Sequence, residues 1–461
     1  MRKLTSLLLL AAATRLAAQQ PSAYHQLGRA ILREMIETNT TASAGNTTTI
    51  AEQLQVRFKD AGFPEADVQV VGPSPKNRNL IVRYRGSGAK KPVMLLAHLD
   101  VVEALPSDWT YDPFKLTEKD GYLYGRGTQD VKGGAATLVT ALLRMKQEHV
   151  VPDRDFILAL TAGEEGGMPY NGVDWLLKNR RDLIDAEYVI NVDAGGGELD
   201  KAGKHTLFDV QAAEKVFHSV RITATNPGGH SSLPRKDNAI YSLARALDRI
   251  AAYDFPVKPN DVVRAYFAKA ASTAEPEIAG AMRKVASGAN DPAAIARLSK
   301  IPLYNALLRT TCVATLLRGG HAENALPQTA EATVNCRMLP GDDPAGVEKA
   351  LVRAINDTSI KLAPVNAAVP SPASPLRPDV FNAVQASVNA TWKNVVVVPY
   401  METGATDGLY LRNAGVPVYA FSGIFIATDD VRAHGKDERI LVSSFDDALD
   451  FTYDFLKRLS R

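Results

Sequence analysis

The chain has 461 residues, of which 46% are apolar and 23% are charged, which is the composition of a globular protein in water. Its formal net charge of +2 gives no reason to expect nucleic acid or an anionic membrane as a partner. A chain of this length exceeds one ordinary hydrophobic core, so we expect two or three domains.

The N-terminus has the three-part pattern of a secretory signal peptide. Two basic residues precede an apolar run over residues 4–13, and small residues follow up to Ala18. This run is too short to span a bilayer. We therefore expect residues 1–18 to be a signal peptide, and the mature protein to be secreted or periplasmic without a membrane anchor. The alternative is a buried N-terminal helix.

The N-terminal half alternates helices with apolar strands. Helical periodicity predicts helices over residues 24–36, 50–58, 136–145 and 173–183. Runs of β-favouring residues predict strands over residues 68–71, 79–84, 93–97, 156–160 and 188–192. This alternation predicts an α/β domain with a mixed, largely parallel sheet and helices on both faces.

The pattern changes at Lys215. Residues 216–224 alternate apolar and polar side chains, as a half-buried antiparallel strand does. The elements that follow are helices over residues 239–250 and 347–355, strands over 310–317 and 330–337, and a long helical segment over 257–300. Together they predict a small α+β domain inserted into the first one. A linker rich in Pro, Ala and Ser leads back over residues 364–375.

The last segment regains the α/β pattern. It contains predicted strands over residues 395–398 and 418–421 and a final helix from Phe445, for which Ser443 and Asp446 give a capping signal. We therefore expect a catalytic domain made of residues 19–214 and 365–461. The inserted lid domain is expected over residues 215–364.

Two cysteines, Cys312 and Cys336, lie in β-rich runs joined by a turn. An exported protein meets oxidising conditions, so the two could pair across neighbouring strands. Two free buried thiols fit the sequence equally well, because sequence does not give the geometry of a disulfide.

Imidazoles and carboxylates follow several predicted strands, where α/β sheets place their ligand sites. His98 and Asp100 end one strand on the same face, which suits a metal-bound histidine oriented by a carboxylate. Further candidates follow along the chain: Asp130, Glu164, Glu165, Asp193 and His434. Two imidazoles with several carboxylates suit two divalent metal ions, with zinc the best match and cobalt or manganese as alternatives.

In this order, the motifs resemble the dizinc hydrolase family of aminoacylase, carboxypeptidase G, acetylornithine deacetylase and succinyl-diaminopimelate desuccinylase, with the carboxypeptidase-S-like branch nearest. The resemblance runs from His98 to His434. It implies that His98 and Asp193 hold one metal, that Glu165 and His434 hold the other, and that Asp130 bridges the two.

The resemblance also assigns the remaining roles in this part of the chain. Glu164 matches the general base, Asp100 matches the partner that orients His98, and a cis peptide is expected after Asp130.

The inserted domain resembles the family as well. His230, in Gly-Gly-His-Ser-Ser, matches the histidine that stabilises the oxyanion and often reaches across a dimer; the alternative is a plain turn residue. Asn324 and Arg337 match contacts to a substrate carboxylate, although Arg337 could serve a structural ion pair. Gly404 lies in the Gly-Ala-Thr-Asp loop that closes the pocket. A homodimer through the lid domain follows as an expectation.

These expectations combine into one function. The chain is expected to be an exported dizinc metallopeptidase that acts on dipeptides or short peptides with a free carboxylate. An N-acyl amino acid amidohydrolase is the alternative, because it differs only in what fills the acyl pocket. A binding protein without turnover is less favoured, because the general base Glu164 is present.

Overall fold

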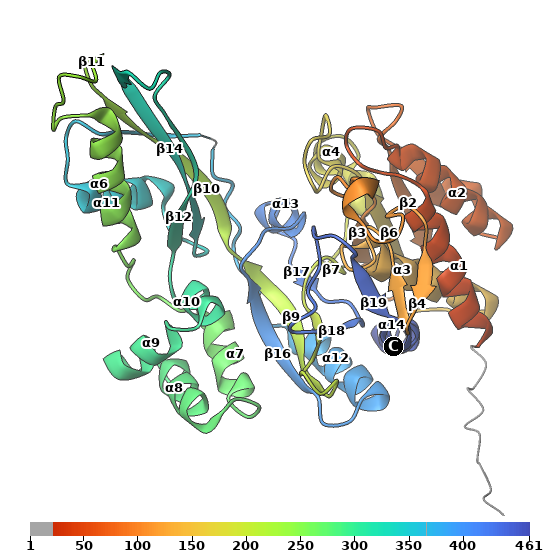
Figure 1. Cartoon of the computed structure of the whole chain (residues 1–461). Coiled ribbons are helices and arrows are strands. Elements are labelled where there is room, and N and C mark those ends of the chain that lie inside the picture. Colours follow the sequence, from red (N-terminus) through yellow and green to blue (C-terminus); the bar gives the residue numbers. More distant parts are fainter. Residues whose placement is uncertain (1–21, 366) are drawn as a thin grey trace, which may run out of the picture.

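The computed structural model describes residues 22–365 and 367–461, so the predicted signal peptide lies outside the described residues. Figure 1 shows a large α/β body and a smaller α+β body, which we call the lid. The strand β9 (His205–Glu214) leads into the lid, and β16 (Val396–Glu402) pairs beside it. No helix within the described ranges is long and apolar enough to cross a membrane.

A mixed ten-stranded sheet forms the centre of the large body, in the order β1-β2-β6-β3-β7-β17-β9-β8-β18, with β16 paired beside β9. Its middle strands β6, β3, β7 and β17 run parallel. His98 stands opposite Thr161 in the register, so the carboxyl ends of β3 and β6 meet at one edge. The strand bounds are β1 (Val68–Val71), β2 (Asn79–Tyr84), β3 (Val93–His98), β6 (Phe156–Thr161), β7 (Tyr188–Asn191), β8 (Gly196–Leu199), β17 (Val418–Ala420) and β18 (Phe425–Ala427).

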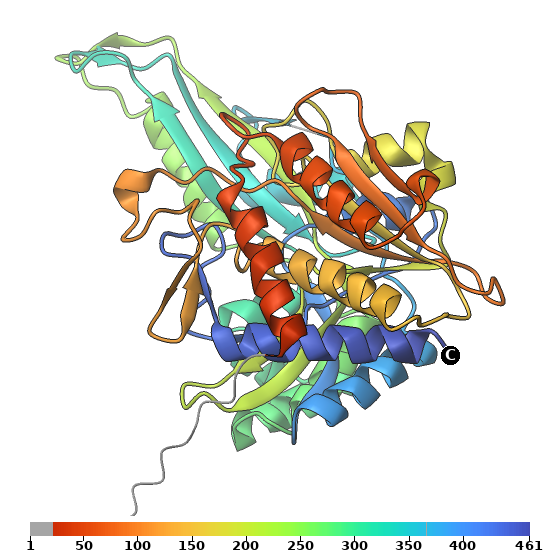
Figure 2. The ribbon, with the colours of Figure 1, turned by 90° about the vertical axis from the view of Figure 1, so that its right-hand side faces the viewer.

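Helices cover both faces of this sheet because its strands present apolar side chains on both. On β3, Val93, Leu95 and Ala97 enter one core, and Met94 and Leu96 enter the core on the opposite face. Figure 2 shows α1, α3 and α14 beside one another over the first face. The predicted α/β architecture is therefore confirmed. The bounds are α1 (Ala23–Glu37), α2 (Thr47–Asp60), α3 (Lys132–Gln147), α4 (Gly172–Asn179), α5 (Arg181–Ile184), α12 (Pro378–Thr391), α13 (Gly408–Asn413) and α14 (Val442–Leu459).

The lid contains a four-stranded antiparallel sheet in the order β12-β14-β10-β15, with α6 and α11 over one face. Residues 216–225 pair with β14 and β15, and do not extend the sheet of the large body. A two-stranded ribbon of β11 and β13 stands at the tip. The bounds are β10 (Val216–Thr225), β11 (Gly229–His230), β12 (Thr311–Gly319), β13 (Ala325–Leu326), β14 (Thr329–Met338), β15 (Lys361–Pro364), α6 (Ala239–Ala251) and α11 (Pro344–Ile355).

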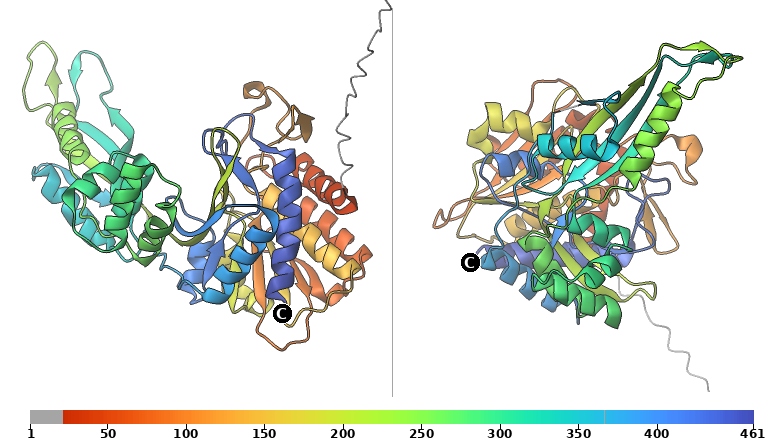
Figure 3. Two further views of the ribbon diagram at one scale, coloured as in Figure 1. Left: turned by 90° about the horizontal axis from the view of Figure 1, so that it is seen from below. Right: turned by 90° about the vertical axis from the view of Figure 1, so that its left-hand side faces the viewer.

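The helical segment that the sequence assigns to the lid packs differently. Val263, Tyr266 and Phe267 share the apolar core of the large body, and the rings of Tyr266 and Tyr400 lie 5.8 Å apart. The helical face of the lid sheet is already covered by α6 and α11, which leaves β9 and β16 to receive these helices. Figure 3 shows the group next to the large body from two further sides. The bounds are α7 (Asp261–Ala270), α8 (Pro276–Ala286), α9 (Pro292–Leu298) and α10 (Pro302–Leu308).

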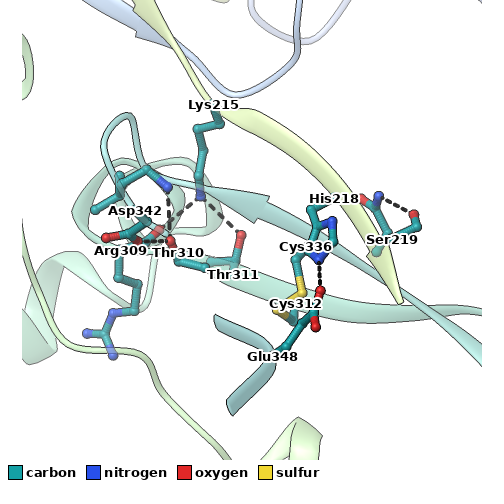
Figure 4. Close-up of a disulfide and its surroundings, with 12 residues drawn as sticks. Lys215, His218, Ser219, Arg309, Thr310, Thr311, Cys312, Cys336, Asp342 and Glu348 are labelled. Carbon is teal, nitrogen blue, oxygen red and sulfur yellow. Dashed lines mark hydrogen bonds and ion pairs between the residues drawn. A yellow bond between two sulfur atoms is a disulfide. The ribbon is translucent and has the colours of Figure 1, made fainter. Parts of the chain in front are cut away.

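Cys312 and Cys336 form a disulfide, which decides between the two states that the sequence left open. The two residues stand directly opposite each other in the register of β12 and β14. Figure 4 shows this disulfide beside His218 and Glu348. It ties the edge strand of the lid sheet to its neighbour.

The capping signal predicted for the last helix is wrong. α14 begins at Val442, so Ser443 lies inside the helix. Among the described residues, no side chain makes a capping hydrogen bond at the N-terminus of α14. Asp446 instead accepts a hydrogen bond from Arg29 Nε at 3.0 Å. Arg29, on a distant helix, therefore binds the carboxylate that the local pattern assigned to the cap.

The remaining elements are short. They are two 3-10 turns (Glu65–Asp67, Pro106–Asp108) and a small sheet of β4 (Thr117–Lys119), β5 (Tyr122–Tyr124) and β19 (Arg439–Leu441).

Candidate metal centre

The predicted ligands come together at the carboxyl ends of three parallel strands. His98 ends β3, Glu164 and Glu165 follow β6, and Asp193 follows β7. Parallel strands end at the same edge of a sheet, so residues far apart in the sequence meet there. The His98 side chain is almost wholly buried, with 1% of its surface exposed, whereas His434 lies at the mouth of the site with 57% exposed.

The Asp130 carboxylate stands between two imidazoles. Its Oδ1 lies 3.1 Å from His98 Nε2, and its Oδ2 lies 3.0 Å from His434 Nε2. The residue lies in the loop that leads into α3, and the peptide bond that follows it is cis, as the resemblance implies. A carboxylate with one oxygen toward each imidazole has the orientation of a bridging ligand.

Two further carboxylates complete a group around each imidazole. Asp193 Oδ1 lies 3.4 Å from His98 Nε2, and Glu165 Oε2 lies 3.1 Å from His434 Nε2. The ligand atoms of His98, Asp130 and Glu165 lie within 4.8 Å of one another, as do those of His98, Glu164 and Asp193. The structure therefore brings all five expected ligands and Glu164 into one cluster.

The donor set of this cluster fits a pair of divalent cations. Imidazole nitrogen and carboxylate oxygen are the donors that zinc and similar ions take. The Glu165 Oε1 atom is buried and has no hydrogen-bond partner among the described residues. A buried carboxylate oxygen without a donor is costly unless a cation satisfies it.

Burial and close packing of charges shift the pKa values in the cluster. Burial raises the pKa of Asp193 to about 7 and the pKa of Glu164 well above its usual range. Burial alone would lower the pKa of His98, but Asp193 and Asp130 raise it well above its usual value. Hydrogen bonds from His434 and His98 outweigh burial and lower the pKa of Asp130. Without cations, the cluster therefore holds protons on these side chains, and cations that bind to the cluster would displace those protons.

Asp100 orients His98 in a different way from the one expected. His98 Nδ1 lies 2.9 Å from the backbone carbonyl oxygen of Asp100, while the Asp100 carboxylate is 3.9 Å away. Because a carbonyl only accepts, Nδ1 carries a proton, and Nε2 is the nitrogen that faces Asp130 and Asp193. The carboxylate instead accepts backbone N–H bonds from Gly163 at 2.8 Å and Glu165 at 3.0 Å. It thus holds the loop that carries both glutamates.

Glu438 is a buried residue of the site that the sequence analysis did not single out. Its Oε1 accepts backbone N–H bonds from Gly127, Gln129 and Asp130 at 3.1, 2.7 and 3.1 Å, and its Oε2 accepts from Arg126. This carboxylate fixes the backbone of the bridging residue. The sequence feature that could have identified Glu438 is its position four residues after His434, directly before the short strand β19.

The structure does not bring the predicted lid residues to the cluster. His230 is exposed on β11, and the backbone of Asn324 accepts from Ser231 N at 3.0 Å, so these two residues lie at the lid tip, distant from the large body in Figure 1. Arg337 lies on β14 with its guanidinium 4.9 Å from the centre of the Phe217 ring. Gly404 follows β16, where its N–H donates to Glu402 at 3.1 Å.

Comparisons with known proteins agree with this site. The sequence model of peptidase family M20/M25/M40 matches residues 94–458, so the chain belongs to this family. It is 28% identical over 408 residues to the probable carboxypeptidase S-like 2 of Dictyostelium discoideum, covering 84% of this chain and 75% of that protein. It is also 28% identical over 378 residues to human N-fatty-acyl-amino acid synthase/hydrolase PM20D1, covering 80% and 74%.

Solved structures share the whole fold. An M20 metallo-carboxypeptidase from Sulfolobus solfataricus superposes with a TM-score of 0.69 and 19% identity, covering 94% of this chain and 99% of that chain. The dipeptidase Dug1p of Saccharomyces cerevisiae superposes with a TM-score of 0.66 and 15% identity, covering 95% and 98%. The chain is therefore an M20-family hydrolase that acts on amide bonds.

The first prediction concerns the number of bound metal ions. We expect the reconstituted protein to bind two divalent ions, Asp130→Ala to bind none firmly, and Glu165→Ala to keep one, because Asp130 has one oxygen close to each imidazole, at 3.1 and 3.0 Å. Elemental analysis after gel filtration measures this. Glu277→Ala, which removes an exposed carboxylate of α8 paired with Arg297, is the matched control and should keep both ions. Two ions retained by Asp130→Ala would contradict the bridging role.

Proposed function

We propose that the chain is an exported dizinc metallopeptidase that hydrolyses the amide bond of dipeptides or short peptides with a free carboxylate. The observation that carries this proposal is the Asp130 carboxylate between the imidazoles of His98 and His434, at 3.1 and 3.0 Å. The similar solved structures named as a carboxypeptidase and a dipeptidase support the peptide as substrate.

The chain's own residues supply the proton chemistry of this reaction. When bound by His98, Asp193, Asp130, Glu165 and His434, a metal pair lowers the pKa of a water molecule and polarises a carbonyl. Glu164 lies beside the ligands, with its carboxylate within 4.8 Å of the ligand atoms of His98 and Asp193. It takes the proton of the attacking water and returns it to the leaving amine. In the metal-free protein, burial and then the Asp193 carboxylate raise the pKa of Glu164 well above its usual range.

Arg337 is suited to hold the carboxylate of the substrate. Its planar guanidinium pairs with a carboxylate through two parallel hydrogen bonds. Stacking over Phe217 fixes the plane of the group, and burial lowers its pKa without removing the charge, because guanidinium remains protonated in proteins. Gly404 would border the same substrate from the large body.

An N-acyl amino acid amidohydrolase is the second candidate. Relatives named as N-fatty-acyl-amino acid synthase/hydrolase from human and Xenopus tropicalis favour it, at 28% and 29% identity. The same water, base and carboxylate contacts serve both substrates, since each is an amide next to a carboxylate. The two candidates differ in the group on the acyl side.

A substrate panel tests the proposed function. We expect the zinc-loaded protein to release amino acids from dipeptides faster than from N-acyl amino acids, as measured by amine release. Glu164→Gln keeps size and should keep both metals, but it cannot take a proton, so turnover should fall roughly 10²–10⁴-fold. Faster cleavage of N-acyl amino acids would support the second candidate. No turnover of any amide by the metal-loaded wild type would contradict both.

Two features support export. Residues 1–18 carry the signal pattern, and the Cys312–Cys336 disulfide suits an oxidising compartment. We expect protein recovered outside the cytoplasm of an exporting host to begin at Gln19, because cleavage follows the small residues that end at Ala18. N-terminal sequencing measures this. A cytoplasmic product that retains the first 18 residues would contradict export.

We propose that two copies pair through the lid, along β12. This strand is an edge of the lid sheet, so its outer backbone groups have no neighbouring strand within the described chain. Val313, Leu316 and Leu317 on it expose 62%, 61% and 69% of their surface. An exposed apolar edge strand is a ready site for pairing with another chain. In the family that the sequence resembles, the histidine that matches His230 often reaches across a dimer, and we propose the same role for His230.

Size measurement tests the pairing. We expect a dimer in light scattering for the wild type, and a monomer for the double variant Leu316→Lys and Leu317→Lys, because two charges oppose burial of the edge. Val151→Lys is the matched control, since it changes an apolar side chain of the large body that is 74% exposed. A monomeric wild type would contradict the proposal.

A further inference from the structure

Asp407 is a buried acid whose side chain turns away from the helix it precedes. It holds the N-cap position of α13, where an aspartate ordinarily accepts a backbone N–H bond from the first turn. Within the described part of the chain, the Asp407 carboxylate makes no capping hydrogen bond to α13. With 3% of its surface exposed, the residue has to find its donors elsewhere.

The donors come from the two ends of the loop that carries Glu164 and Glu165. Oδ2 of Asp407 accepts from Thr161 Oγ1 at 3.2 Å, and Oδ1 accepts from Asn171 Nδ2. Thr161 ends β6 and Asn171 is the N-cap of α4, so the two donors bracket the loop. The Asn171 amide also donates to the Gly163 carbonyl at 3.3 Å.

The segment that leads to Asp407 is fixed from its other end as well. We call residues 402–407 the substrate loop. Oε2 of the buried Glu214 accepts from Thr406 N at 3.1 Å and from Thr406 Oγ1 at 2.9 Å. Glu402 holds Gly404 N, and Ala405 is left exposed between these anchors. The loop is therefore a braced turn in which Ala405 is the exposed residue.

We infer that Asp407 is a positioning residue that sets the place of the substrate loop relative to Glu164, through its hydrogen bonds to Asn171 and Thr161. The inference rests on the proposed function, in which a substrate lies between these two loops. Asp407 contacts neither the substrate nor the metal ligands in this role. It acts by joining the substrate loop to the loop that carries Glu164 and Glu165.

The chemistry of the contact explains why the residue is an acid. Burying a carboxylate with only two neutral donors costs free energy, and burial raises the pKa of Asp407 to about 6. An asparagine would be less costly to bury. However, an asparagine offers one acceptor oxygen, so it cannot accept from Asn171 and Thr161 at once, whereas a carboxylate can. Thr161 Oγ1 also lies 3.3 Å from the Ala97 carbonyl oxygen, which shares the single hydroxyl proton.

Asp407→Asn tests the inference in the zinc-loaded protein. We expect kcat for the best amide substrate to fall roughly 10–100-fold, because misplacement by about 1 Å costs on that order. KM should change less than about threefold, and both metals should stay bound. Asp174→Asn is the matched control, because it makes the same change in an acid of α4 that pairs with Lys178 on the surface. It should keep kcat within about twofold.

Asn171→Ser provides a second route to the same contact. Serine keeps the N-cap of α4 but is too short to reach Asp407. We expect it to lower kcat, as Asp407→Asn does. The losses in the double variant should be clearly less than additive, because both changes act on the Asp407–Asn171 pair, although Asn171→Ser also removes the bond to the Gly163 carbonyl. This variant also keeps the inference testable if Asp407→Asn does not fold.

Hydrogen exchange gives a readout apart from turnover. Amides of residues 163–170 and 403–407 should exchange faster in Asp407→Asn, while the strands β3 and β7 keep their wild-type rates. Wild-type kcat in both single variants, additive losses in the double variant, or faster exchange throughout the large body would each overturn the inference. A metal-loaded wild type without any amide turnover would instead contradict the proposed function, which separates the two failures.

Discussion

The contact of the Asp130 carboxylate with two imidazoles sets the requirements for the rest of the large body. Around His98 it gathers the carboxylates of Asp130 and Glu165 in one group and those of Glu164 and Asp193 in another. Like charges repel at such distances, so the backbone has to hold them in place. Three parallel strand ends and the loop before α3 do this. The buried carboxylates of Asp100 and Glu438 then fix the loops by accepting backbone N–H bonds.

The junction between the two bodies is built around two consecutive buried charged residues, Glu214 and Lys215. Glu214 accepts from Ser371 and Thr406 of the large body and pairs with Arg412 at 2.9 Å. Lys215 donates to the carbonyl oxygens of Ala306 and Arg309 and to Thr311, at 2.9, 2.9 and 3.1 Å. Figure 4 shows the lysine reaching Arg309 and Thr311. Consecutive side chains on a strand point to opposite faces, so Glu214 and Lys215 anchor different sides of the junction.

This junction gives the helices α7 to α10 a physical role. Lys215 binds the carbonyl groups at the end of α10, and α7 packs on β9 and β16. Burial, and then the charge of Arg337, lower the pKa of Lys215 to about 7, while Asp342 partly offsets them. The helical group therefore braces β9, which leads into the lid, and its neighbour β16, from which the substrate loop continues at Glu402.

Much of the architecture and the ligand set follow from local sequence patterns. The apolar runs around Val93, Phe156 and Tyr188 predict buried strands, and the polar residues after them predict a site at their ends, because alternation and strand polarity are short-range properties. The strand β9 escaped this reasoning. Its buried face carries Asp209 and Gln211, which hide the apolar signal of a central strand.

Only the tertiary structure decided which distant groups meet. The sequence left the pairing of Cys312 and Cys336 open, assigned Asp446 to a helix cap, and gave the orientation of His98 to a carboxylate. In the structure the cysteines face each other across two strands, Asp446 binds Arg29, and a backbone carbonyl holds His98. Each outcome depends on a partner remote in the chain or on the exact path of the backbone. Local periodicity fixes which face a side chain takes, but the packing of the whole chain chooses its partner.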